Sequence, residues 1–100
     1  MRMPGAIRYP RLHDLFRANH ANKIANKCIK KLSDRQVSAM RMIMGQELPR
    51  YAPLESMVTL DLVAERLKAS DLDGVRGIEP VTRQKLFDAL RKHSLDFKPE

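Results

Sequence analysis

The sequence predicts an all-α protein, a small bundle of four to six helices that ends in a C-terminal helical hairpin. Apolar residues recur at helical spacing in several segments, which is typical of amphipathic helices. Only residues 58–62 alternate like a strand, and no second strand exists to pair with them. Glycines and prolines separate the periodic segments. One hundred residues suffice for one domain with a single modest core.

The chain divides into an N-terminal arm and one helical domain. Residues 1–10 contain two prolines and a glycine with little periodicity, so we expect a flexible arm there. The domain would cover 11–100, with a basic half at 11–45, a proline-containing linker at 46–53 and a neutral half at 54–97. The linker is too short to indicate two independent domains.

Helical spacing begins directly after the arm. Leu12, Leu15 and Phe16 form one amphipathic turn. A second apolar row follows after several polar residues, and it consists of Ile24, Ala25, Cys28 and Leu32. Periodicity leaves open whether residues 11–32 form one helix or two.

The clearest helix start lies at residues 33–36, which read Ser-Asp-Arg-Gln. This is the order of a capping box, in which Gln36 reaches back to the Ser33 amide. The apolar stripe that follows is Val37, Met40, Ile43 and Met44. Gly45 predicts the end of this helix. We expect the methionines to fill the core, although such side chains also suit a surface that contacts a partner helix.

The neutral half contains two further helical segments. The first has a complete apolar face, Leu60, Val63, Ala64 and Leu67, and Thr59 can cap it. The second begins at Pro80, because proline suits the first helical position. Its predicted inner side carries Val81, Leu86, Phe87, Ala89 and Leu90. Gly74 and Gly77 bracket the corner before it, where the backbone needs a positive φ or a close approach.

The pattern over residues 70–93 resembles the helix-hairpin-helix, a small DNA-backbone-binding motif. The positions that carry the resemblance are Leu72, Val75, Gly77, Ile78, Leu86 and Phe87. Glu79 stands where the motif has its second hairpin glycine, and Arg83 stands where it has a small residue. The resemblance implies that hairpin amides face a phosphate. An ordinary helical corner that needs two glycines to turn is the alternative interpretation.

Charge is distributed unevenly along the chain. Residues 1–50 contain eleven Lys and Arg against three acids, whereas residues 51–100 contain eight against nine. The first half therefore carries the whole net charge of +7. Such asymmetry favours a face that attracts polyanions, because counterion release drives association with nucleic acid. A solubilising surface is the simpler alternative.

A repeated asparagine pattern indicates where nucleic acid would bind. Asn19, Asn22 and Asn26 share one face of a continuous helix, and lysines follow its edge. Asparagine can bridge the donor and acceptor of an adenine edge, and lysine neutralises phosphate. A second phosphate contact is expected at the glycine corner. The predicted nucleic-acid contacts are Asn22, Lys23, Asn26, Lys27, Lys30, Lys31, Arg35, Arg76, Gly77, Arg83 and Lys85. A solvated helix face is the alternative.

These observations favour a small non-enzymatic nucleic-acid-binding regulator or accessory protein, with DNA favoured over RNA. The alternative is a helical protein–protein interaction module that binds an acidic protein partner, such as an inhibitor or adaptor from a phage or other compact genome. Its contact residues would be Met40, Met44 and Tyr51. A homodimer is compatible with either function.

Other classes of protein are disfavoured. His13, His20 and His93 lack a completing ligand at zinc spacing, and the single Cys28 excludes an internal disulfide. No acid, base and nucleophile are placed together, so we expect neither an enzyme nor a cofactor or metal. No apolar run approaches the roughly 18 residues of a membrane span, and no signal-peptide pattern is present. A cytoplasmic protein without membrane contact is the expectation.

Overall fold

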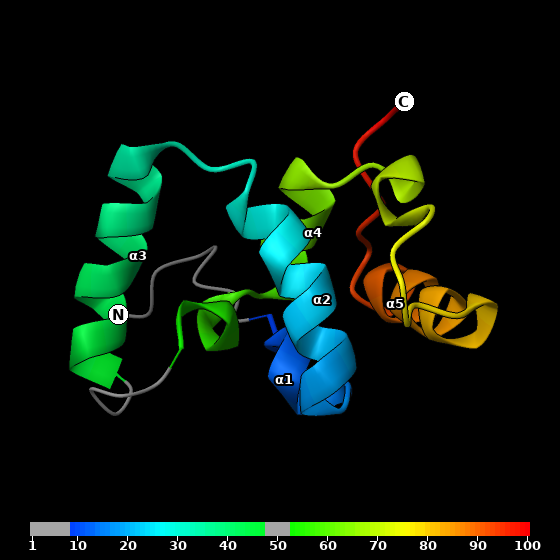
Figure 1. Ribbon diagram of the computed structural model, residues 1–100, viewed down its shortest axis with the longest axis horizontal. Coiled ribbons are helices and arrows are strands. Elements are labelled where there is room, and N and C mark those ends of the chain that lie inside the picture. Colours follow the sequence, from blue (N-terminus) through cyan, green and yellow to red (C-terminus); the bar gives the residue numbers. More distant parts are fainter. Residues whose placement is uncertain (1–8, 48–52) are drawn as a thin grey trace.

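The computed structural model describes residues 9–47 and 53–100, with residues 43–47 as backbone only. Within these ranges the chain is helical, and the predicted all-α class is confirmed (Figure 1). The α-helices are α1 (Leu12–Leu15), α2 (Ala18–Ile29), α3 (Asp34–Glu47), α4 (Leu60–Arg66) and α5 (Pro80–Lys92). Two 3₁₀ turns accompany them, η1 (Leu54–Met57) and η2 (Ala69–Leu72). No helix in the described ranges is long and apolar enough to cross a bilayer.

The core forms around α2, which lies in the middle of the molecule between α3 and α5 (Figure 1). Ile24, Ala25 and Cys28 of the predicted apolar row are buried, and the row gains Ala21. Leu32 lies beyond the end of α2 and is only half-buried. The apolar face of α4 is buried against it, with Leu60, Val63 and Leu67 fully inaccessible. Leu86 and Leu90 of α5 complete the core from the other side.

Residues 11–32 form two helices, because the backbone is extended at Phe16 and Arg17. The break turns the Phe16 side chain inward, where only 6% of the residue stays exposed. The start of α1 is hydrogen-bonded to the segment that leads into α4. The Leu12 amide donates to the Val58 carbonyl at 2.9 Å, and the Leu60 amide donates to the Pro10 carbonyl at 3.1 Å. Pro10 is thus part of the packed body, and residues 1–8 of the predicted arm lie outside the described residues.

The predicted capping box of α3 is confirmed. The Ser33 amide donates to Gln36 Oε1 at 2.8 Å, and the Gln36 amide donates to Ser33 Oγ at 3.2 Å. The predicted stop at Gly45 is wrong, because α3 continues to Glu47 and enters the expected linker. A glycine inside a helix costs only about 1 kcal/mol, so it need not end one. The remainder of that linker up to residue 52 lies outside the described residues.

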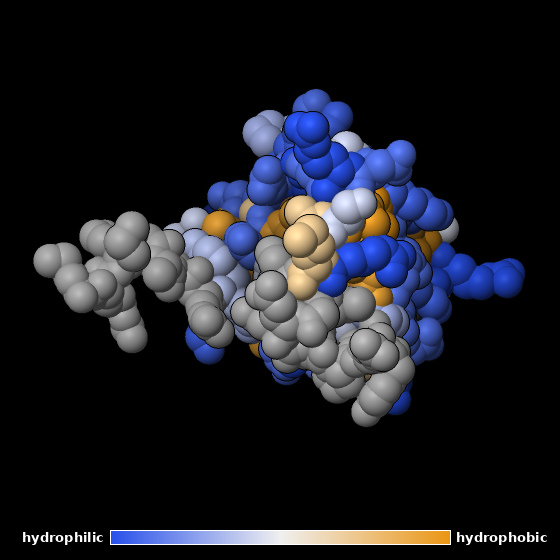
Figure 2. Space-filling view, turned by 90° about the vertical axis from the view of Figure 1, so that its left-hand side faces the viewer, coloured by the Kyte–Doolittle hydropathy of each residue, from blue (hydrophilic) through white to orange (hydrophobic). Residues whose placement is uncertain are grey.

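Helix α3 stands at one side of the molecule instead of filling the core (Figure 1). Of its described side chains, Met40 packs against the core and is only half-buried, while Met42 is 72% exposed. Among the coloured residues on the side that faces the viewer in Figure 2, most are hydrophilic and some apolar residues are visible. Of the predicted stripe, Met40 packs against the core and Val37 is half-buried, while the side chains of Ile43 and Met44 lie outside the described residues.

Helix α5 begins at Pro80 as predicted, but its inner face is shifted. Val81 is 77% exposed, and Thr82 is buried in its place. Thr82, Leu86 and Leu90 recur every four residues and so lie on one face of the helix. Beyond α5 the chain folds back, and the Lys98 amide donates to the Leu67 carbonyl at 2.7 Å.

Candidate nucleic-acid interface

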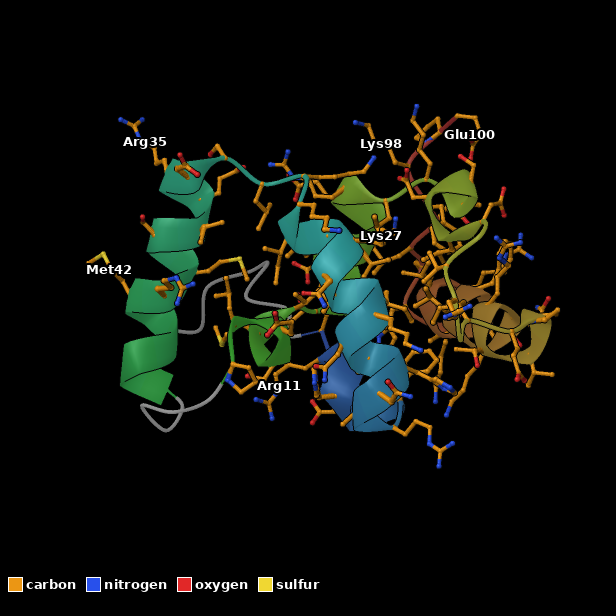
Figure 3. The ribbon with its side chains drawn as sticks, viewed as in Figure 1. Arg11, Lys27, Arg35, Met42, Lys98 and Glu100 are labelled. Atoms are coloured by element: carbon orange, nitrogen blue, oxygen red, sulfur yellow. The ribbon has the colours of Figure 1, made fainter. Side chains whose placement is uncertain are left out.

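Several of the predicted contact residues lie on α2 or directly after it, away from the buried face of the helix. Asn26 and Lys30 are exposed. Lys23 and Lys27 are half-buried along one edge, and Lys31 continues the same edge past the helix end. Figure 3 shows Lys27 on this edge of α2. Within the helix, the four-residue spacing of Lys23 and Lys27 corresponds to about 6 Å along the axis.

The segment from η2 to the start of α5 lies along this lysine edge in the opposite direction. At one end Lys31 Nζ is 2.9 Å from Asp71 Oδ2. Near the middle Lys23 lies against Gly77. At the other end His20 Nδ1 is 3.5 Å from Thr82 Oγ1. Two patches that are fifty residues apart in sequence thus form one continuous surface.

Gly77 is favoured by its backbone conformation and is closely approached by a side chain. Its φ of +89° lies in the region that disfavours side chains. A Cβ at this position would also collide with the Lys23 ammonium, whose Cε lies 3.2 Å from the same point. Gly74 is different, because its φ is +74° but no atom lies within 4 Å of the position of a Cβ. The close approach at Gly77 therefore places the Lys23 ammonium directly on the corner.

Hydrogen-bond donors without acceptors gather at this corner. Among the described residues, Lys23 Nζ has no hydrogen-bond or ion-pair partner. The backbone amides of Arg76 and Gly77 also donate to no described group. Both residues are exposed, so these amides are open to solvent or to a ligand. The arrangement suits an anion with several oxygen atoms.

Two of the predicted phosphate ligands are held by carboxylates. Asp71 accepts from Lys31 and, at 2.8 Å, from the Lys68 amide. The Lys31 side chain, together with that amide, holds the pKa of the Asp71 carboxyl below its usual range. Arg83 pairs with Asp73. Within the described residues Lys27, Lys30 and Arg76 have no such partner.

The remaining predicted contacts do not join this surface in the same way. Asn22 Oδ1 is 2.8 Å from His13 Nε2, so a base could reach it only after that hydrogen bond breaks. Arg35 lies on α3, away from the corner (Figure 3). The Lys85 ammonium lies 5.0 Å from the centre of the Phe16 ring. For the alternative protein-binding role, the Met44 side chain and Tyr51 lie outside the described residues.

Sequence reasoning did not assign a role to His20, Asp71 or Asp73 in this surface. His20 shares the edge of α2 with Lys23, Lys27 and Lys31, which its spacing from them indicates. The aspartates precede the glycine corner, but nothing local identifies the cations that they meet. Their pairing is a tertiary contact between segments that are far apart in sequence.

The described residues give no indication of other chemistry at this site. Burial raises the pKa of the Cys28 thiol to about 12, so this thiol stays protonated and unreactive at neutral pH. No group of three His, Cys, Asp or Glu side chains in the described ranges is placed to hold a metal ion. No protein-family model, curated protein or solved structure matches the chain.

Proposed function

We propose that this protein binds nucleic acid through its phosphate backbone, along the lysine edge of α2 and the Gly77 corner, as a non-enzymatic regulator or accessory protein. The observation that carries the proposal is the Lys23 ammonium, which lies on the exposed glycine corner at Gly77 and has no ion-pair partner among the described residues. A phosphate oxygen is a suitable acceptor for this ammonium, because a hydrogen bond between an ammonium and a charged oxygen is stronger than one between neutral groups.

A polyanion fits better than a single phosphate because further cations continue the site. Lys27 and Lys30 extend it along α2, and Arg76 extends it at the corner. Each neutralised phosphate releases condensed counterions, so several such contacts together give substantial affinity. The resemblance to a helix-hairpin-helix supports the same kind of ligand. The Glu79 carboxylate at the start of α5 would repel a phosphate there. We therefore expect the phosphate to bind on the Lys23 side of the corner.

The proposal is tested by fluorescence anisotropy with labelled duplex DNA over a series of salt concentrations. We expect the logarithm of the association constant to fall linearly with the logarithm of salt concentration. The triple change Lys23→Gln, Lys27→Gln and Lys30→Gln should reduce this slope by roughly 2.7, at about 0.9 for each lost contact. Duplex RNA and single-stranded DNA of the same sequence identify the preferred strand type.

A matched control removes three exposed cations elsewhere, on α3, at the end of α5 and in the C-terminal segment: Arg41→Gln, Lys92→Gln and Lys98→Gln. Both triple variants carry the same net charge, so a general charge effect would change both slopes equally. A larger loss from the α2 set supports the proposed site. Absence of binding at low salt, or affinity that is indifferent to salt, would refute the function.

A further inference from the structure

We propose, on the basis of the nucleic-acid role above, that Asp73 determines which cations of the site reach an anion. In the free protein its carboxylate pairs with the Arg83 guanidinium. Arg83, in the first turn of α5, is therefore withheld from a bound strand. An arginine fork matches phosphate in a bidentate way, so withholding it removes a strong contact.

The two corner aspartates differ in how firmly they are held. The Asp71 side chain is 23% exposed and accepts from both Lys31 and the Lys68 amide. The Asp73 side chain is 64% exposed, and Arg83 is its single side-chain partner among the described residues. Asp71 thus belongs to the structure of the η2 turn. Asp73 contributes a charge at the site without bonding the backbone through its side chain, so its replacement should leave the fold intact.

The Asp73 carboxylate competes with an incoming anion for the Arg83 guanidinium because it is held close to it by the chain. Asp73 is tethered ten residues from Arg83, so its effective concentration at the guanidinium is on the order of millimolar or higher. A free anion with a similar affinity for the guanidinium has to approach that concentration to displace it. Asparagine at position 73 keeps the shape of the side chain, removes the charge and releases Arg83.

The experiment compares Asp73→Asn with Asp88→Asn in duplex-DNA binding. Asp88 lies about 140° around α5 from Arg83 and accepts from Gln84 Nε2 at 2.9 Å. Both variants gain the same net charge. One additional phosphate contact should raise the affinity of Asp73→Asn roughly eightfold at about 0.1 M salt and steepen the salt slope by roughly 0.9. The gain from Asp88→Asn should be smaller, with an unchanged slope.

The variant Arg83→Gln then shows whether the gain in DNA affinity of Asp73→Asn depends on Arg83. In the wild-type background, where Asp73 holds this arginine, we expect less than about a twofold loss of affinity. In the Asp73→Asn background the same change should abolish the whole gain. Circular dichroism of each variant checks that the helical content is unchanged.

The outcomes separate the two proposals. Equal gains from Asp73→Asn and Asp88→Asn, or a gain that survives Arg83→Gln, would overturn the role of Asp73 while duplex binding by the wild type still supports the function. Increased inhibition of DNA binding by inorganic phosphate at constant ionic strength in Asp73→Asn alone would support the release of Arg83. Absence of duplex binding by every variant would overturn both proposals.

Discussion

Helices α2 and α3 both come from the basic half, and both have clear apolar spacing, yet they occupy opposite situations in the fold. α2 is covered by α1, α4 and η2 and supplies the centre of the core. α3 stands at the side and packs through Met40. The comparison shows that apolar periodicity predicts a helix. How deeply the apolar face of that helix is buried depends on how many other elements pack against it. The comparison also separates the cations of α2, which face a neighbouring segment, from those of α3, which face solvent.

The largest expected effect tests this difference in burial. Ile24→Ala in α2 should lower the free energy of unfolding by about 3 kcal/mol, because it opens a cavity in the fully buried centre. Met40→Ala in α3 should cost only about 1 kcal/mol, because that side chain is half-buried. Urea unfolding followed by circular dichroism measures both. Similar losses for the two variants would mean that α3 is as much a part of the core as α2.

The next effect concerns the contact between α2 and the glycine corner. Gly77→Ala and Gly74→Ala both place a side chain at positive φ, and each should destabilise the fold by about 1 kcal/mol. Only at position 77 does the new Cβ collide with Lys23. We therefore expect Gly77→Ala to weaken duplex binding several-fold more than Gly74→Ala does, as measured by anisotropy. Equal losses of affinity would show that the Lys23 ammonium does not need to lie on the corner.

Sequence predicted the features that local interactions decide. The capping box at Ser33 and Gln36 depends on side chains three residues apart, and the structure contains both of its hydrogen bonds. Pro80 begins α5 because a missing amide costs nothing at the first helical position. The buried face of α4 follows from helical spacing alone. Each of these signals lies within a few residues of the structure that it determines.

Features that depend on distant segments were not predicted. Periodicity left open whether residues 11–32 form one helix or two, and the position of the break, next to the buried ring of Phe16, is seen only in the fold. Val81 was expected on the inner side of α5 but is exposed, and Thr82 is buried, because the direction of α5 is set by its packing on the core. For the candidate site, the lysines of α2 and the glycine corner were each identified from sequence. Their juxtaposition, and the pairing of Lys31 and Arg83 with aspartates, required the fold.

The smallest expected effect concerns the ion pair that joins the end of α2 to η2. The variants Lys31→Gln, Asp71→Asn and their combination form a double-mutant cycle, and we expect a coupling energy of about 0.5 kcal/mol because both groups are partly solvated. The folded-state pKa of Asp71 lies below its ordinary value, so this stabilisation is present above the ordinary carboxyl pKa. It is lost as pH falls through the lowered pKa. Urea unfolding of all four proteins at neutral and strongly acidic pH measures the coupling, and a coupling that persists after the carboxyl is protonated would show that the contact is not ionic.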